Sequence, residues 1–350
     1  MTFLKPGFRH PDLEPNAAGY TFKDYEGGLS TLCAGCGHDS VNAAIIRACF
    51  ELSIAPHKVV KLSGIGCSSK SPAYFLGKSH GFNTVHGRMP SLATGANMAN
   101  RDLLYLGVSG DGDTASIGIG QFIHTVRRNL NMVYIVMNNG CYGLTKGQYS
   151  ATADKGSVGK KGDPNMLESI DLCELAIQLG AGFVGRSFSG DKQQLVPMLK
   201  AAMSYEGMSF LDVISPCVTF NNTPGSTKSY HWVREHREAT ATFDFVPFRQ
   251  EITTEYGGGQ TEKVTLHDAS VIYLYKEAEH EQVTDRCLAM EALEHHKKRG
   301  RILTGILYID PEGNDTHEIL HTSKRPLNAM DEQDLCPGND VLSAINDRFR

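Results

Sequence analysis

Two cysteines in the stretch STLCAGCGHDS (30–40) are the first residues of this sequence that point to chemistry. Cys33 and Cys36 stand two residues apart in a glycine-rich segment, a spacing that lets both thiolates face one point. The candidates are a zinc ion, a redox-active disulfide or an iron-sulfur cluster. Nine cysteines in 350 residues are too sparse for a disulfide scaffold. A structural disulfide is therefore excluded, and a metal centre or a catalytic dithiol remains.

Two further cysteines follow apolar runs that read as buried strands. Cys67 ends the segment GIGC after the run at 59–63, and Cys217 follows FLDVISP at 210–216. In a parallel sheet the carboxyl ends of strands share one edge, so four thiolates can converge there. A 4Fe-4S cluster, a zinc site and unconnected thiols all remain open on spacing alone. Core or incidental positions are expected for Cys49, Cys173, Cys287 and Cys336.

A second constellation lies between GDGD (110–113) and the paired asparagines at 138–139. Each follows an apolar run, with a helical pattern between them, so Asp111 and Asn139 are expected side by side at neighbouring strand ends. A hard cation such as Mg²⁺ takes one carboxylate, one amide oxygen and a backbone carbonyl, and leaves positions for phosphate oxygens. The alternative is a tight turn and a strand cap without a ligand. SIGIGQ (116–121) is not a dinucleotide fingerprint, because it lacks a third glycine and follows no strand directly.

The elements that must position these residues alternate between strand and helix patterns. Apolar runs at 59–63, 103–110, 132–139 and 210–215 predict buried strands, and helical spacing is found at 41–52, 117–129 and 169–180. Asp39 or Ser40 is the expected N-cap of the first helix, and Gly180 the expected end of the third. This alternation predicts an α/β fold with a doubly wound, mainly parallel sheet and ligands at the strand ends.

From about residue 240 the sequence pattern changes and predicts a smaller α+β segment. We expect a strand pair within 251–275, a helix within 281–300, and a second hairpin within 301–320 that turns at Pro311–Asn314. The predicted organisation is an N-terminal arm (1–24), a main domain (25–239) and a C-terminal extension (240–350).

Charge and hydropathy exclude some function classes. The formal net charge is -5, and the only dense basic run, HHKKRGR at 295–301, is interpreted as a solvated helix end, so nucleic acid is not an expected partner. The N-terminus lacks the apolar core of a signal peptide, and no later stretch reaches 18 uncharged apolar residues. We therefore expect a cytoplasmic protein without a membrane partner.

The spacing from GDG to NN resembles the signature of thiamine diphosphate enzymes, which implies that Asp111 and Asn139 bind Mg²⁺ together with the backbone carbonyl of Cys141. Together with CxGCG, GIGC and the late SPC, it resembles the β subunits of 2-oxoacid:ferredoxin oxidoreductases over roughly residues 25–235. The resemblance implies one 4Fe-4S cluster held by Cys33, Cys36, Cys67 and Cys217. Further residues match the family's thiamine diphosphate pocket, namely Ile65, Gly66, Cys67, Ser68, His86, Arg88, Gly112, Asp113, Gly143 and Leu144, with His38 as a phosphate candidate.

The resemblance also implies an activity. It is oxidative decarboxylation of a 2-oxoacid with capture of the acyl group by coenzyme A and single-electron transfer through the cluster to ferredoxin. No glutamate here matches the one that such thiamine enzymes use on the aminopyrimidine, which implies a separate α subunit that completes the site. Lys70 and Lys146 match lysines of subunits that act on larger 2-oxoacids, and either could contact a substrate carboxylate or a coenzyme A phosphate.

The long C-terminal extension resembles β subunits assigned to 2-oxoglutarate, which favours 2-oxoglutarate as the substrate. Three alternatives stay open at this point. The first is the same chemistry on pyruvate or a branched-chain or aromatic 2-oxoacid. The second is a thiamine decarboxylase or synthase with a structural zinc, and the third is a cluster-bearing electron-transfer or assembly subunit without carbon chemistry.

Overall fold

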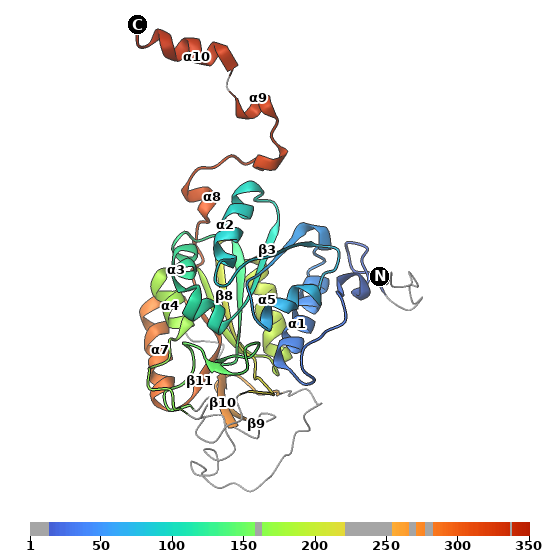
Figure 1. Cartoon of the computed structure of the whole chain (residues 1–350), viewed down its shortest axis with the longest axis vertical. Helices are drawn as coiled ribbons and strands as arrows, with labels where there is room; N and C mark the ends of the chain where they lie inside the picture. Colours follow the sequence, from blue (N-terminus) through green and yellow to red (C-terminus); the bar gives the residue numbers. More distant parts are fainter. Residues whose placement is uncertain (1–13, 158–162, 221–253, 266–270, 277–282, 337) are drawn as a thin grey trace.

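One nine-stranded sheet organises the chain (Figure 1). The computed structural model describes residues 14–157, 163–220, 254–265, 271–276, 283–336 and 338–350. The predicted domain boundary near residue 240 lies outside these residues. In the described part, no helix is both long and apolar enough to span a bilayer.

The strand order of the large sheet is β2-β1-β3-β4-β8-β7-β11-β10-β9. Every neighbouring pair from β2 to β7 is parallel, β7 and β11 are antiparallel, β11 and β10 are parallel, and β10 and β9 are antiparallel. The strands are β1 (Val59–Ser63), β2 (His80–Asn83), β3 (Leu104–Gly110), β4 (Met132–Asn138), β7 (Phe183–Phe188), β8 (Met208–Ile214), β9 (Thr261–Thr265), β10 (Val271–Lys276) and β11 (Ile302–Ile309). A separate two-stranded ribbon pairs β5 (Cys141–Tyr142) with β6 (Gln148–Tyr149).

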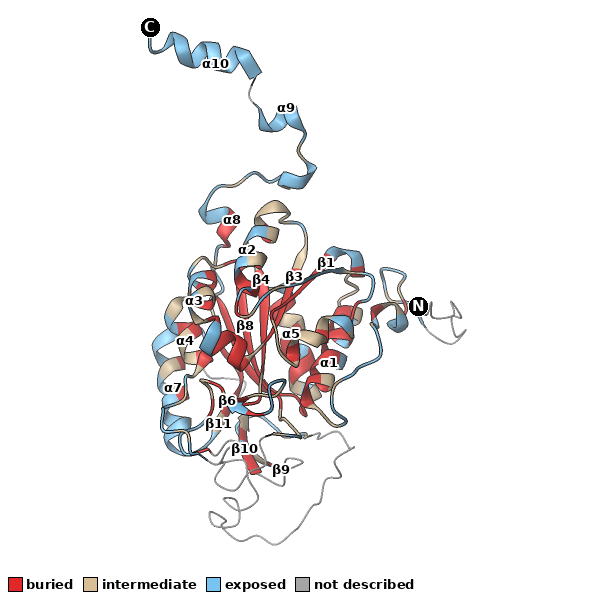
Figure 2. Cartoon of the chain, viewed as in Figure 1, coloured by how far each residue is buried: buried red, intermediate tan, exposed pale blue. Residues whose placement is uncertain are grey.

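Helices cover both faces of the sheet, as the alternation of patterns predicts (Figure 1). One face carries α1 (Gly37–Glu51) and α5 (Lys192–Ser204), whose apolar sides join the core around Val108 and Ile135. The other face carries α2 (Met89–Ala99), α3 (Ile119–Arg127), α4 (Leu172–Leu179) and α7 (Arg286–Lys298). The central strands are buried on both sides, which explains their continuous apolar runs (Figure 2).

The ends of two helices test the sequence interpretation. Gly180 ends α4 in the left-handed region, at φ 91°, as predicted. The N-cap prediction for α1 was wrong, because that helix begins at Gly37 and its cap residue is Cys36. The carboxylate of Asp39 instead accepts a hydrogen bond from the Ser30 hydroxyl at 2.7 Å, which ties the cysteine loop to the first turn of the helix.

The C-terminal segment continues the main sheet instead of forming a sheet of its own. β9 and β10 form the predicted antiparallel pair, and β11 joins them to β7. The second predicted hairpin was wrong, because the residues after β11 form α8 (Thr316–Ile319). Asp315 caps that helix by accepting from the Glu318 amide at 2.9 Å. Beyond it, α9 (Glu332–Leu335) and α10 (Gly338–Asp347) lie on an exposed arm (Figure 2).

Candidate cofactor and metal site

The carboxyl ends of β1, β3, β4 and β8 meet at one edge of the sheet, and the sequence motifs follow these four ends directly. Gly64–Cys67 follow β1, Asp111–Asp113 follow β3, Asn139–Gly143 follow β4, and Cys217 lies three residues after β8. The structure therefore brings together the two motifs that the sequence keeps far apart.

Asp111 is the buried acid of this edge, with a side chain 1% exposed. Its Oδ1 accepts from the Asn139 amide at 3.2 Å, and its Oδ2 lies 2.9 Å from the Thr152 hydroxyl. Among the described residues the donors to this carboxylate are hydroxyl and peptide groups, and none is cationic. Burial raises the pKa of Asp111 because desolvation disfavours its charged form. A bound cation would reverse that effect, so the surroundings of Asp111 fit a cation-binding site.

A chain of polar contacts runs from Asp111 into the sheet. The Thr152 hydroxyl is also 3.1 Å from Asn138 Oδ1, and Asn138 Nδ2 donates to Asp212 Oδ1 at 3.1 Å. Asp212 in turn accepts from the buried Arg186 at 3.1 Å. The other acceptor of Arg186, at 2.5 Å, is Asp171, the N-cap of α4. The position of the acid is thus fixed from the interior of the sheet.

Asp113 serves a different purpose from Asp111. Its Oδ1 accepts from His86 Nδ1 at 2.8 Å and from the Gly87 amide at 2.9 Å, so it fixes the loop that carries His86. A Cβ on Gly64 would lie 1.9 Å from Asp113 Oδ2, so only glycine fits at the end of β1. Gly64 of the GIGC motif therefore leaves room for Asp113 of the GDGD motif.

A cleft at this edge is lined by most of the predicted pocket residues. Of the predicted set it contacts His38, Ile65, Gly66, Cys67, Ser68, His86, Asp111, Gly112, Asp113, Asn139, Cys141, Gly143 and Leu144. It encloses about 40 Å³. Three predicted residues are not in its lining. Arg88 is exposed, Lys146 is exposed with φ 77°, and Lys70 is half-buried within electrostatic range of Cys67.

His38 is buried and lies at the base of the cleft. Its Nδ1 lies 2.6 Å from the Ser215 hydroxyl, and burial lowers the pKa of His38 to about 4. The imidazole is therefore neutral near pH 7, and any contact with a phosphate would be a hydrogen bond and not a charge pair.

The four predicted cluster cysteines approach one another next to the cleft. Electrostatic interactions link Cys36 with Cys33 and Cys217, and link Cys67 with the same two thiols. A Cβ on Gly143 would lie 3.5 Å from Cys67 Sγ and 3.8 Å from Cys217 Sγ, so this glycine keeps the space between them open. All nine cysteines lie in the described part of the chain, and none of them forms a disulfide. Within the described ranges no three His, Cys, Asp or Glu side chains already stand at ion-binding distances.

The thiols of this group differ in acidity. Burial raises the pKa of Cys36 to about 12 and also raises the pKa of Cys67. A hydrogen bond from the Cys141 thiol lowers the pKa of Cys217 to about 7, and the amides of Thr219 and Phe220 act in the same direction. Near pH 7 a large fraction of Cys217 is therefore in the thiolate form, which is the form in which cysteine binds metals.

Sequence patterns missed several residues of the site. Tyr142 and Thr145 line the cleft, and the Tyr142 hydroxyl donates to the Gly112 carbonyl at 3.1 Å. Thr152 contacts Asp111 across 41 positions, and the thiol of Cys141 contacts Cys217. A threonine in a loop carries no motif, so no local signal could have identified Thr152. Cys141 was assigned a backbone role only, although its thiol also faces the cysteine group.

Comparison with known proteins connects this geometry to a family. Residues 64–213 match the model described as thiamine pyrophosphate enzyme, C-terminal TPP binding domain. A 2-oxoacid:ferredoxin oxidoreductase subunit beta from Sulfolobus sp. is 40% identical over 57% of this chain and 65% of its own length, so the match spans less than two thirds of that relative. The 2-oxoglutarate synthase subunit KorB of Methanocaldococcus jannaschii is 39% identical over 54% of this chain and 69% of the relative.

This chain belongs to the β-subunit family of 2-oxoacid:ferredoxin oxidoreductases. A solved 2-oxoglutarate:ferredoxin oxidoreductase from Magnetococcus marinus, with 2-oxoglutarate, coenzyme A and succinyl-CoA bound, aligns with a TM-score of 0.71 and 26% identity. The alignment covers 95% of this β-family chain and 98% of the solved one. It confirms the α/β fold and includes most of the C-terminal segment.

The contact between Cys141 and Cys217 can be tested in protein from which metals have been removed. Iodoacetamide should modify Cys217 with a half-maximal rate near pH 7, because only the thiolate reacts and its fraction rises through that pH. Cys141→Ala removes the donor and should move this midpoint upward by about one pH unit, the effect of losing one hydrogen bond. Peptide mass spectrometry would follow Cys217 separately, with the exposed Cys33 as internal reference.

Cys141→Ser keeps a donor and should leave the midpoint near its original value. Identical midpoints in the unmodified protein and the Cys141→Ala variant would show that the thiol of Cys141 does not act on Cys217.

Proposed function

We propose that this chain is the β subunit of a cytoplasmic 2-oxoglutarate:ferredoxin oxidoreductase. In the proposed reaction 2-oxoglutarate, coenzyme A and two oxidised ferredoxins give succinyl-CoA, carbon dioxide, two reduced ferredoxins and a proton. The carbon–carbon bond to the carboxylate breaks, a thioester forms, and two electrons leave one at a time.

The observation that supports the proposal is that both predicted groups of ligands follow strands that end at one edge of the sheet. The buried Asp111 carboxylate lacks a cationic donor among the described residues, and the thiols of Cys33, Cys36, Cys67 and Cys217 interact electrostatically nearby. The match to a TPP binding domain over residues 64–213 supports a cofactor at this edge.

Asp111, Asn139 and the carbonyl of Cys141 would hold Mg²⁺, and the cleft residues would surround thiamine diphosphate. Carboxylate, amide and carbonyl oxygens are the ligands that Mg²⁺ prefers. When bound, the cofactor supplies the nucleophilic carbon that cleaves 2-oxoacids. The chain's own contribution is placement. Thr152 and the Asn139 amide hold the acid, and Asp113 holds His86 at the cleft wall.

Cys33, Cys36, Cys67 and Cys217 would hold a 4Fe-4S cluster, which exchanges one electron at a time. Cys67 also lines the cleft, so one ligand would stand between the two centres. A zinc ion in the same place would have no accessible redox change.

The small size of the cleft supports an obligate partner. Ligand pockets usually measure about 300–1,000 Å³, whereas this cleft encloses about 40 Å³ within the chain. We infer that an α subunit supplies the opposite wall, including the carboxylate for the aminopyrimidine. The half-buried Lys70 and the exposed Lys146 are proposed to contact the distal carboxylate of the substrate or an anionic group of coenzyme A.

Thr152→Val should weaken Mg²⁺ binding in the presence of thiamine diphosphate by roughly tenfold, the usual effect of losing a group that orients a metal ligand. Calorimetric titration of the complex with its partner would measure the affinity. Thr152→Ser keeps the hydroxyl and should bind almost normally, whereas an unchanged affinity in Thr152→Val would exclude the positioning role.

Metal and sulfide analysis tests the cluster. Anaerobically purified complex should contain about four irons and four acid-labile sulfides per copy of this chain, beyond those of its partner. Substituting Cys217 by Ser should lower that content, whereas Cys173→Ser should not, because Cys173 is buried in the core on α4. About one zinc without sulfide would sink the electron-transfer proposal and leave a non-redox thiamine enzyme.

The substrate is tested by dye reduction. The complex should reduce a viologen with 2-oxoglutarate and coenzyme A, and Asp111→Ala should abolish this reduction together with thiamine diphosphate binding. Activity on pyruvate but not on 2-oxoglutarate would reject the substrate assignment. Cofactor binding without activity on any 2-oxoacid would favour a subunit that only transfers electrons.

A further inference from the structure

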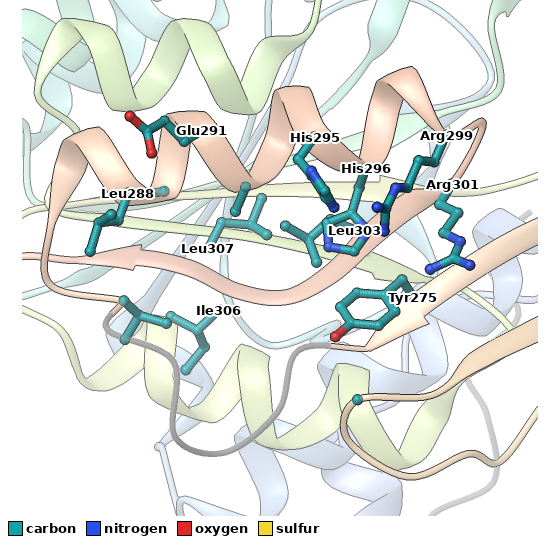
Figure 3. A pocket seen from close by; sticks show the side chains of 14 residues that line it. Tyr275, Leu288, Glu291, His295, His296, Arg299, Arg301, Leu303, Ile306 and Leu307 are labelled. Atoms are coloured by element: carbon teal, nitrogen blue, oxygen red, sulfur yellow. The ribbon is translucent and has the colours of Figure 1, made fainter.

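The basic run at 295–301 has a role that its sequence does not suggest. It ends α7 and leads into β11, and four of its side chains line a cavity of about 710 Å³ between these two elements and β10 (Figure 3). That volume lies in the range of about 300–1,000 Å³ typical of sites for small molecules. The lining shares no residue with the cofactor cleft, so this is a separate cavity.

Part of the cavity wall is apolar. Aliphatic side chains of α7 and β11 form it, namely Leu288, Ala289, Ala292, Leu303, Ile306 and Leu307. Such a surface takes an apolar ligand body by removing it from water.

One end of the cavity is positively charged. His295, Arg299 and Arg301 contribute to its lining there, and Figure 3 shows Glu291 further toward the start of the same helix, near Leu288. Burial lowers the pKa of His296, and the neighbouring His295, Arg301 and Arg299 lower it further. The arrangement gives the cavity a polarity along its length.

Among the described residues, several polar groups at this end have no side-chain partner. His296 stacks on Tyr275 with ring centroids 4.2 Å apart, and its buried Nδ1 has no hydrogen-bond partner. Over the described ranges neither Arg299 nor Arg301 pairs with a carboxylate. By contrast, Lys298 on the same run is not among the lining residues and pairs with Glu294 at 2.9 Å. Unpaired guanidinium groups beside an apolar wall suit an anion with an apolar body.

We propose that this cavity binds a small amphipathic organic anion, with its apolar body against the leucines of α7 and β11 and its phosphate or carboxylate on Arg299 and Arg301. The printed names of the family and of its relatives place no ligand in this cavity. The inference does not depend on the proposed function, because it concerns a different cavity.

Two fluorescent probes with one ring system test the proposal. 8-Anilinonaphthalene-1-sulfonate carries the anion, and N-phenyl-1-naphthylamine is its uncharged counterpart. The complex with its partner subunit would be titrated with each in saturating thiamine diphosphate and coenzyme A, so that the cofactor cleft does not contribute. We expect one sulfonate probe per copy of this chain.

Matched variants separate the charge from the apolar wall. Replacing both Arg299 and Arg301 by Gln should weaken the sulfonate by about tenfold, as for loss of charge-assisted hydrogen bonds, and leave the uncharged probe unchanged. Ala292→Phe should fill the cavity and abolish binding of both probes. Lys298→Gln removes a charge from the same run outside the lining and should change neither. Circular dichroism would verify that each variant is folded.

If Lys298→Gln weakened binding of the sulfonate probe as much as the double arginine variant does, the effect would be a general one of surface charge. If Ala292→Phe still bound the probes, they would bind elsewhere. Either result would overturn the proposal. Failure of the probe to bind when coenzyme A is present would also overturn it. Displacement of the sulfonate by ATP would identify nucleotides, and displacement by octanoate would identify alkyl carboxylates. If neither displaces it, the binding is adventitious and the proposal fails.

Discussion

The burial of the Asp111 carboxylate is the constraint on which the rest of the cofactor edge depends. The cofactor edge is the edge of the sheet at which β1, β3, β4 and β8 end. A carboxylate removed from water is costly unless hydrogen bonds and an opposite charge compensate it. This chain supplies the hydrogen bonds, from the Asn139 amide and from Thr152, but among the described residues no cation. The same acid follows β3 at a place where Gly64 and Gly112 allow close packing, since a Cβ on Gly112 would lie 2.5 Å from the Tyr142 ring. The site is therefore assembled around a carboxylate that the described residues leave without an opposite charge.

That charge is connected to the interior through a buried network. Arg186 bridges Asp171 and Asp212, and Asp212 holds Asn138, which shares Thr152 with Asp111. Removing one partner from such a network leaves an unpaired buried charge, so it fixes geometry more than it adds stability. Asp212 lies on β8, whose carboxyl end leads to Cys217. The strand that helps to position Asp111 thus also leads to Cys217, one of the proposed cluster ligands.

The sequence allowed the fold class and the grouping of motifs to be predicted, because buried parallel strands leave continuous apolar runs and their ends share an edge. It did not allow the details that depend on contacts between distant residues. The helix start at Cys36, the role of Thr152 and the contact of the Cys141 thiol are of this kind. The prediction of a second C-terminal hairpin was wrong for a related reason. An apolar run such as 302–309 has the same pattern whichever strand it pairs with, and here it pairs with β7 and β10.

This pairing places the C-terminal extension against the polar network. β11 lies beside β7, the strand of Arg186, and a smaller cavity of about 170 Å³ is lined by Asn138, Arg186, Asp212 and Arg301 among others. Arg301 also lines the larger cavity of the extension. One guanidinium therefore borders both the amphipathic cavity and the network that ends at Asp111. Because charges in a partly buried setting interact more strongly than in water, an anion on Arg301 would change the field at Arg186 and Asp212. The C-terminal extension is thus connected to the cofactor edge through Arg301 and the buried network of Arg186 and Asp212.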